Sequence, residues 1–477
     1  MSTVRKLAKN TGWLMASQLV TNFLAFFWTI LIARYLGVDG FGLLSAALAA
    51  TGILGIFADL GLGTYTTREV ARNPAQAPRL LGNIIIIKII LSTIIIGVIL
   101  ASLQLLEYPL PEGWVYALIG GYAILSSFST LFYGLYQAHE RMEFQAIGLI
   151  INSIMLFVGF ILCIYLQLSV VAFGAVYLIT SFITMIYTLF LTRWKFEAPA
   201  FEVNLSYWKK TIILALPFGV TSIFTLIYFW IDTVMLTALQ GNAATGLYNA
   251  SYKLIMVLLS IYHVYMIAIF PVMAKYYKKS PQSLKLTYHR SVKYILIIII
   301  PVAIGTTFLA RDIISLVYTS EFLPSIMALQ ILIWAVVFMF VNGLSTNLLG
   351  SIDKQLTVSK ITAIGATFNI LANLIFIPYL SFIGASITTV STEIIIFVLF
   401  GYIVSKTGYS LGEKTVNLLW RILIPNLIMI GVLVFVPVSL VPMIIICTVV
   451  YFTAIFLIGA VDETDINIIK SVFRKQS

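Results

Sequence analysis

The sequence predicts an all-α polytopic membrane protein with about 14 transmembrane helices, arranged as two parallel six-helix bundles plus two C-terminal helices. Of the 477 residues, 61% are hydrophobic and only 10% are charged, whereas soluble domains carry about 25% charge. The apolar residues also come in runs of about 20, which as helices cross a hydrocarbon core of ~30 Å. Each run must be helical, because lipid offers no hydrogen bonds to the backbone.

The apolar runs place the spans in order along the chain. The expected spans are residues 12–34, 40–64, 82–104, 114–136, 143–165, 170–192, 211–238, 244–274, 291–310, 324–349, 356–378, 382–404, 416–436 and 441–460. Residues 1–10, residues 201–210 and the tail after Asp462 combine basic and apolar side chains. We expect these three segments to be amphipathic helices on the membrane surface.

The distribution of basic residues predicts the orientation. With the N-terminus inside, 25 of the 29 Lys and Arg residues fall in cytoplasmic segments; only Arg34 and Arg311 lie outside, and Lys88 and Lys253 lie within spans. This asymmetry follows the positive-inside rule. It predicts a multi-pass protein of the cell membrane with both termini in the cytoplasm. The net charge of +11 is then explained by topology and by anionic membrane lipids, not by nucleic acid.

A weak internal repeat suggests two halves of similar design. Residues 36–43 and 240–247 share two glycines and a leucine at a constant offset of 204, and Tyr-Leu recurs at 165–166 and 379–380. Parallel halves of this kind are a known transporter design, with the substrate site between them. The expected units are an N-terminal six-helix bundle at 1–194, a second at 195–410, and two extra helices with a cytoplasmic tail at 411–477.

Spans 7 and 8 carry polar stripes at helical spacing. The two stripes are Thr221, Thr225, Tyr228 and Asp232 on span 7, and Asn249, Lys253, Met256, Ser260 and His263 on span 8. Lys253 lies ~14 Å from the outer end of its span by helical rise, near the midplane. Ionisable groups at that depth are costly, so two interpretations stay open. Asp232 and Lys253 form a structural ion pair, or Lys253 is a cavity cation for a substrate phosphate and Asp232 is a gating or coupling acid.

Span 12 carries a second deep acid. Ser386, Thr389 and Glu393 share one helix face, and Glu393 lies ~16 Å from the outer end. Glu393 is a candidate for proton or sodium coupling; the alternative is a protonated acid bonded to a neighbouring helix. Asn369 and Asn373 on span 11 are expected to hold helices together.

The remaining ionisable groups lie nearer the membrane surfaces. Asp59 and Arg68 are expected in a charge network at the inner gate, and His263 is expected to be a packing histidine more than a ligand. Lys88, six residues inside span 3, is expected to extend to the surface. Arg34 is expected to anchor the outer end of span 1 or to line the outer mouth of a cavity.

Enzyme signatures are lacking in the sequence, which has no Gly-rich phosphate loop, metal-ligand cluster or nucleophile elbow. Cys163 and Cys447 lie in apolar runs and predict neither a disulfide nor a metal site. We therefore expect a protein that is not an enzyme and needs no cofactor or metal.

Several short motifs resemble a known family. They are Asn-Thr-Gly-Trp at 10–13, Ala-Arg-Tyr-Leu-Gly at 33–37, Gly-Phe-Gly-Leu at 40–43, Asp-Leu-Gly-Leu-Gly at 59–63, Thr-Arg-Glu-Val-Ala-Arg at 67–72, Leu-Pro-Phe at 216–218 and Gly-Leu-Tyr at 246–248. Together they resemble the polysaccharide transporter family, the O-antigen-type flippases of the multidrug/oligosaccharidyl-lipid/polysaccharide exporter superfamily.

The resemblance implies two six-helix bundles around a cationic cavity, alternating access, and a polyprenyl-diphosphate-linked oligosaccharide as cargo. Lys253 would then meet phosphate, and the neighbouring polar groups would bind sugar. The cavity arginines typical of lipid II flippases are few, so that cargo is less expected. The alternatives are a proton- or sodium-coupled multidrug or metabolite exporter, and a passive scramblase or glycan-synthase assembly protein. We expect a monomer, with a glycan polymerase or ligase as a possible protein partner.

Overall fold

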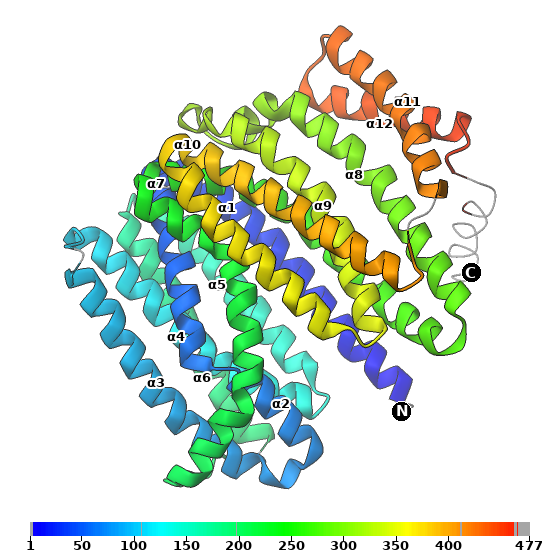
Figure 1. Cartoon of the computed structure of the whole chain (residues 1–477). Coiled ribbons are helices and arrows are strands. Elements are labelled where there is room, and N and C mark those ends of the chain that lie inside the picture. Colours follow the sequence, from blue (N-terminus) through cyan, green and yellow to red (C-terminus); the bar gives the residue numbers. More distant parts are fainter. Residues whose placement is uncertain (1–2, 106, 197, 411–412, 462–464, 466–477) are drawn as a thin grey trace. The chain divides into compact units, whose positions relative to one another are not determined.

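A computed structural model describes residues 3–105, 107–196, 198–410, 413–461 and 465, and it confirms the all-α class. Its helices are α1 (Thr3–Asp59), α2 (Leu62–Arg72), η1 (Pro74–Gln76), α3 (Ala77–Leu105), α4 (Leu110–Ala138), α5 (Met142–Tyr165), α6 (Val170–Lys195), α7 (Leu205–Lys279), α8 (Pro281–Val317), η2 (Ser320–Phe322), α9 (Ser325–Ser351), α10 (Gln355–Lys406), α11 (Glu413–Phe435) and α12 (Leu440–Leu457) (Figure 1). The described residues contain no β-strand.

Three of the helices are broken within their length. The backbone is non-helical at Gly37 in α1, at Gly241 in α7 and at Ser381 in α10. Each break falls where the sequence predicts a tight external turn between two spans. Counted as continuous, 11 helical segments of the described chain are long and apolar enough to cross a membrane. The count of 14 spans stays a prediction.

The internal repeat is visible in the backbone. Gly37 (φ 67°, ψ −173°) and Gly241 (φ 82°, ψ −173°) lie 204 positions apart and share one unusual conformation. At the second offset of 214, Gln167 (φ 53°) and Ser381 (φ 51°) both have a positive φ, which is uncommon for residues other than glycine. The weak sequence similarity therefore marks equivalent turns of the two halves.

The described chain forms two compact units. Unit 1 comprises Met1–Lys253 and Ile370–Ala385, and unit 2 comprises Leu254–Asn369 and Ser386–Ser477. In unit 1, α4 packs against α1 and α6, and α5 packs against α1 and α6; in unit 2, α8 packs against α9, α11 and α12. The predicted division at 194/195 rests on the repeat rather than on packing, and it stays a prediction.

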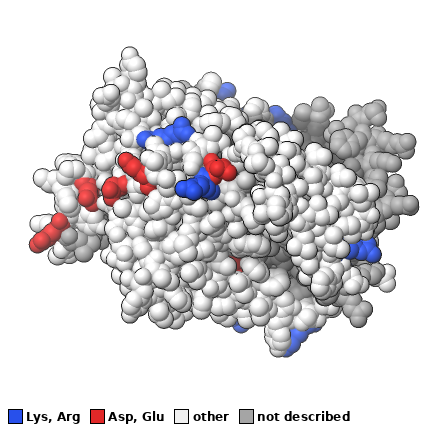
Figure 2. Space-filling model, turned by 90° about the horizontal axis from the view of Figure 1, so that it is seen from above, with Lys and Arg blue, Asp and Glu red and all other residues white. Residues whose placement is uncertain are grey.

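The surface suits a hydrocarbon solvent. Large apolar side chains are exposed along the long helices, including Ile94 (56% exposed), Val158 (57%) and Leu371 (56%). Seen from above, the described surface is mostly uncharged, and its charged side chains gather in a few places (Figure 2). In water such exposure would drive association, whereas in a bilayer it faces lipid tails.

The segment between α6 and α7 corrects one expectation. Residues 201–204 are not helical, and α7 begins only at Leu205. The amphipathic helix expected at 201–210 is therefore formed only from Leu205 onward, and residues 201–204 are an irregular segment. Glu202 of this segment bonds to Arg79 of α3, and Asn204 accepts from the Tyr207 nitrogen at the start of α7, so that the helix begins only after Asn204. The tail expected after Asp462 lies outside the described residues except for Asp465.

Candidate functional site

Lys253 lies on the second half of α7 and is the cation that the sequence places deepest in a span. Its side chain is half-buried, and its Nζ lies 5.4 Å from the centroid of the Trp230 ring. Within the described chain it has no ion-pair or hydrogen-bond partner. A cation over an indole face is attracted by the ring quadrupole, but this contact leaves the ammonium donors available. The predicted ion pair between Lys253 and Asp232 is not formed.

Asp232 instead accepts hydrogen bonds that include one from a tyrosine and one from an asparagine. It is 5% exposed; Tyr248 donates to its Oδ2 at 2.8 Å and Asn373 donates to its Oδ1 at 2.6 Å. Tyr248 stacks on Tyr252 with ring centroids 5.6 Å apart. These residues come from α7 and α10, all within unit 1. A buried carboxylate with this donor set can keep its charge or bind a cation.

Asn373 is the residue of this network that sequence reasoning missed as a site group. Its spacing of i, i+4 from Asn369 predicted interhelical contact, and the contact exists, but its partner is the acid. Asn369 instead lies in unit 2, where its Nδ2 is 3.4 Å from the Oγ1 of Thr392. The signal that could have identified Asn373 is an amide inside a predicted span, at a depth similar to that of Asp232 on span 7.

The other predicted substrate-binding residues differ in their surroundings. Asn249 is buried (1% exposed). Its Nδ2 donates to the Thr245 carbonyl, one turn earlier in the same helix, at 3.0 Å. Ser260 donates to the Val257 carbonyl at 2.7 Å. Thr225 and Arg34 are exposed, Tyr228 is half-buried, and the side chain of Thr221 is outside the described part. His263, a candidate for gating that is expected to be a packing histidine, is exposed as well. The binding roles of all these residues stay predictions.

Glu393 lies in unit 2 and is 2% exposed. Asn342 of α9 donates to its Oε2 at 2.8 Å and to its backbone carbonyl at 3.0 Å. Ser386 and Thr389, on the same face of α10, are buried as well. The carboxyl is therefore bonded to a neighbouring helix, as the structural alternative required. This geometry is equally compatible with an acid that gains and loses a proton or a cation.

Lys88 corrects a second expectation. It does not extend to the surface: its side chain is 0% exposed and its Nζ lies 2.5 Å from Asp59 Oδ1. The ring centroid of Phe128 on α4 lies 5.7 Å from the same Nζ. Six residues of helix separate Lys88 from the end of the apolar run, and Phe128 of α4 lies beside its ammonium. The aliphatic chain therefore turns inward to the acid at the end of α1.

Arg68 does not join Asp59 in the expected network. Its Nε lies 3.0 Å from Glu69 Oε1, and its guanidinium lies 5.1 Å from the centroid of Phe218 on α7. Beside it, the break between α1 and α2 packs tightly on α7: a Cβ added to Gly61 would come within 2.4 Å of the Gly219 nitrogen. The charges at this end of unit 1 are thus divided into the pair of Lys88 with Asp59 and a separate group in which Glu69 pairs with both Arg68 and Arg72.

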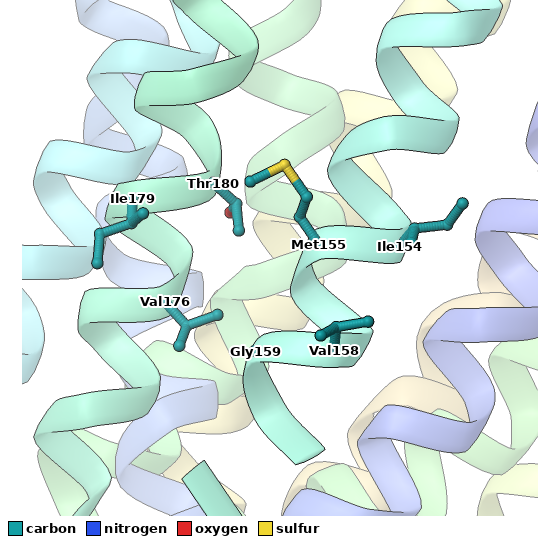
Figure 3. A pocket seen from close by; sticks show the side chains of 7 residues that line it. All are labelled: Ile154, Met155, Val158, Gly159, Val176, Ile179 and Thr180. Carbon is teal, nitrogen blue, oxygen red and sulfur yellow. The ribbon is translucent and has the colours of Figure 1, made fainter. Parts of the chain in front are cut away.

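A hollow of about 330 Å³ lies between α5 and α6, apart from these groups (Figure 3). Its lining is apolar except for Thr180 and includes Met155, Gly159 and Val176. Such a lining offers no charge to a polar ligand. In the described residues, no group of three His, Cys, Asp or Glu side chains is placed to hold a metal.

An all-helical, multi-span chain with an internal repeat and charged side chains inside its helices defines a membrane transporter. A family model described as polysaccharide biosynthesis protein matches residues 7–277, more than half of the chain. The chain therefore belongs to this family, the polysaccharide and lipid-linked oligosaccharide flippases of the multidrug/oligosaccharidyl-lipid/polysaccharide exporter superfamily. A model for MatE also matches residues 217–375.

Individual proteins are similar to this chain over most of their lengths. The uncharacterized membrane protein MJ1068 of Methanocaldococcus jannaschii is 22% identical, over 100% of this chain and 99% of the relative. The probable low-salt glycan biosynthesis flippase Agl15 of Haloferax volcanii is 23% identical, over 90% of this chain and 89% of the relative. The lipid II flippase MurJ in an inward closed conformation has a TM-score of 0.79 at 14% identity, covering 95% and 99% of the two chains.

Proposed function

We propose that this protein translocates a polyprenyl-diphosphate-linked oligosaccharide across the cell membrane by alternating access. The observation that carries the proposal is Lys253. An ammonium within a membrane helix, with no anion beside it in the described chain, is costly unless a substrate supplies the negative charge. A diphosphate does so, and the compact, strongly charged ammonium suits it. The family membership and the glycan-related relative support the same cargo class.

Asp232 and Glu393 are the proposed coupling acids. Both are buried and both accept a hydrogen bond from an asparagine amide, one in each unit. Cation or proton binding at either acid would change the charge inside the bundle, and charge changes of this kind can bias a two-state equilibrium. Asp232 lies on the same helix as Lys253, so it is the better placed of the two to link coupling with cargo.

A multidrug exporter is the second candidate, and the MatE match over residues 217–375 favours it. Exporters of cationic drugs need acids that face the drug. Here Asp232 is engaged by Tyr248 and Asn373, whereas the group with available donors is the cation Lys253. This contrast favours anionic cargo.

The deciding experiment uses purified protein in liposomes. Flipping of a fluorescent short-chain polyprenyl-diphosphate oligosaccharide is measured for the wild type, Lys253→Ala and Lys253→Arg, with a lipophilic cation dye as competitor. We expect flipping to fall at least about tenfold in Lys253→Ala, since a charge-assisted contact contributes about 1.5–3 kcal/mol, and to be partly kept in Lys253→Arg. The dye should not compete. Full activity of Lys253→Ala would refute the phosphate contact, and competition by the dye would favour the exporter.

A further inference from the structure

We propose that the strap of residues 198–204, which joins α6 to α7, is a membrane anchor that seats an apolar ridge in an anionic lipid leaflet. The ridge consists of Phe201, Val203 and Leu205, which are 67%, 76% and 73% exposed. This role goes beyond cargo translocation. It uses the predicted orientation, in which this end of unit 1 faces the anionic cytoplasmic leaflet.

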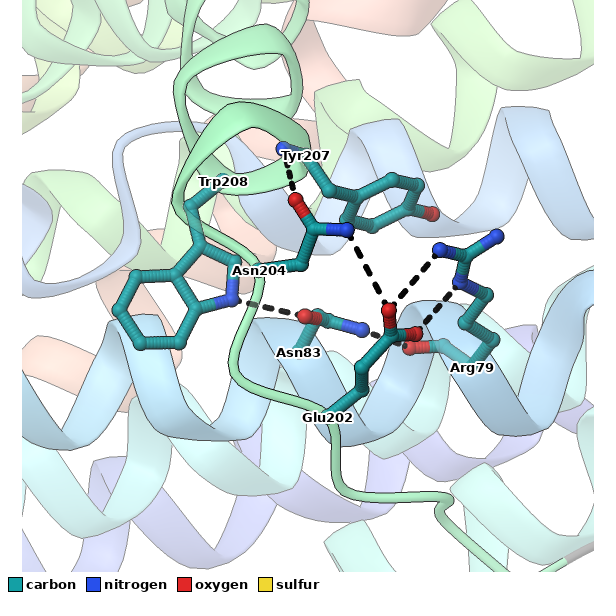
Figure 4. A network of polar contacts seen from close by, with 6 residues as sticks. All are labelled: Arg79, Asn83, Glu202, Asn204, Tyr207 and Trp208. Carbon is teal, nitrogen blue, oxygen red and sulfur yellow. Dashed lines mark hydrogen bonds and ion pairs between the residues drawn. The ribbon is translucent and has the colours of Figure 1, made fainter.

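The first observation is that the strap is fixed to the protein along one side. Glu202 and Arg79 form two hydrogen bonds, of 2.8 and 3.1 Å. Asn204 donates to Glu202 at 3.3 Å and accepts from the Tyr207 nitrogen at 3.0 Å. Figure 4 shows Glu202 directed toward Arg79, with Asn204 beside it. The residues at even positions of the strap are therefore turned toward α3 and the start of α7.

Backbone contacts fix the strap further. The Ala200 nitrogen donates to the Pro78 carbonyl at 2.8 Å. A Cβ added to Gly82 of α3 would lie 1.9 Å from the Ala200 oxygen, so only glycine permits this approach. At the far end, the Trp208 indole donates to Asn83 Oδ1 at 2.7 Å (Figure 4). The strap thus lies against α3 in one defined position instead of moving as a loose linker.

The ridge follows from this attachment. In the non-helical chain before Leu205, the side chains of Glu202 and Asn204 are held by bonds to the protein, whereas those of Phe201 and Val203 are exposed. With Glu202 and Asn204 held on the protein side, Phe201 and Val203 are left on the other. Single exposed apolar residues are ordinary, but alternate apolar residues on one side of a fixed segment make a continuous apolar edge.

The strap also lies at the depth of the membrane surface. From Val170 to Lys195, α6 has 26 residues, a length of about 39 Å at 1.5 Å per residue. This exceeds the ~30 Å hydrocarbon core, so the end of α6 lies among the headgroups. Trp194 is 64% exposed there, and Lys195 Nζ lies 3.8 Å from its ring centroid. Exposed tryptophan with a nearby cation is typical of the interface.

The basic residues on both sides of the strap indicate that the lipids it contacts are anionic. Two pairs of exposed basic residues flank the strap: Arg193 and Lys195 before it, and Lys209 and Lys210 after it. Within the strap, Glu202 is neutralised by Arg79. Apolar side chains bordered by cations bind the interface by insertion together with attraction to anionic headgroups. Each basic residue near such a surface shifts binding by about 1 kcal/mol, or about fivefold.

A labelled residue in the ridge tests the proposal. The environment-sensitive fluorophore NBD is attached to Val203→Cys, in a background in which the two native cysteines are replaced by alanine, and the protein is placed in nanodiscs with or without anionic phospholipid. We expect blue-shifted emission that is quenched by lipids carrying a nitroxide near the headgroup. NBD on Lys279→Cys, an exposed position at the end of α7, is the control for water and should be quenched less.

Charge and protein contact are separated by two further measurements. Replacing the four flanking basic residues by glutamine should lower quenching in anionic nanodiscs. For each residue replaced, the equilibrium constant for inserting the ridge into the lipid should fall by about fivefold. Water-like emission at position 203 would overturn the proposal. Blue-shifted emission without quenching would overturn it too, because it would show that protein covers the ridge. Neither readout depends on flipping, so a failed anchor and a failed cargo assignment give different results.

Discussion

The buried pair of Lys88 and Asp59 gives the sharpest test of the structure. Asp59→Asn removes the carboxylate charge with little change in shape, and it leaves an ammonium that is 0% exposed without its anion. Lys88→Met instead leaves the carboxylate, whose side chain is 22% exposed and can still reach polar surroundings. Removing one partner of a buried pair typically costs 3–5 kcal/mol. We therefore expect Asp59→Asn to cost about 5 kcal/mol and Lys88→Met about 3 kcal/mol.

The double variant decides whether the two groups act as a pair. Independent effects would add to about 8 kcal/mol. Replacing both charges removes the unpaired ion, so the double variant should cost less than about 3 kcal/mol. Arg141→Gln is the matched control. Its pair with Glu143 has the same 2.5 Å separation, but Arg141 is 51% exposed, and exposed pairs contribute only about 0–1 kcal/mol.

Unfolding in mixed micelles, titrated with a denaturing detergent, measures these differences. Cys163 and Cys447 are buried, so their reaction with a thiol-reactive fluorophore reports unfolding of each unit. Single-variant costs below about 1 kcal/mol, or a double variant that is additive, would refute the assignment of a desolvated, mutually dependent pair. In either case Lys88 would be solvated despite its position under α4.

Three other perturbations have defined outcomes. Gly246→Ala places a methyl 2.1 Å from the Val38 oxygen and should destabilise unit 1 by about 1–3 kcal/mol, whereas Gly305→Ala, with open space around it, should not; equal unfolding midpoints would contradict this. Glu393→Gln should make flipping in liposomes insensitive to an imposed ion gradient, and an unchanged gradient response would make the residue structural. The hydrogen bond from its arginine partner lowers the pKa of Glu202 from its usual 4.5. The strap should therefore keep this stabilisation above pH 4.5 and lose it as the pH falls through the lowered pKa; hydrogen exchange of residues 198–204 would show the loss, which Glu202→Gln should abolish.

Sequence alone determined the class of this protein. The length of an apolar run decides whether a segment can cross the bilayer, and the positions of basic residues decide its orientation; both are local properties. The sequence also located the turns at Gly37 and Gly241, since a positive φ combined with a ψ near 180° is adopted almost only by glycine. The same local logic identified Lys253, Asp232 and Glu393 as ionisable groups deep within predicted spans. None of these inferences needed to know which helix packs against which.

Only the tertiary structure decided the partners of those groups. Asp232 bonds Asn373, 141 positions away in the chain, and Lys88 bonds Asp59, 29 positions away. The periodicity of one helix says which side chains share a face, but not which helix covers that face. The energy of an ion pair inside a bilayer depends on which helix packs over it, because each buried charge is stabilised by the polar groups that replace its water. Sequence therefore specified the chemistry within each span, and helix packing decided which groups meet.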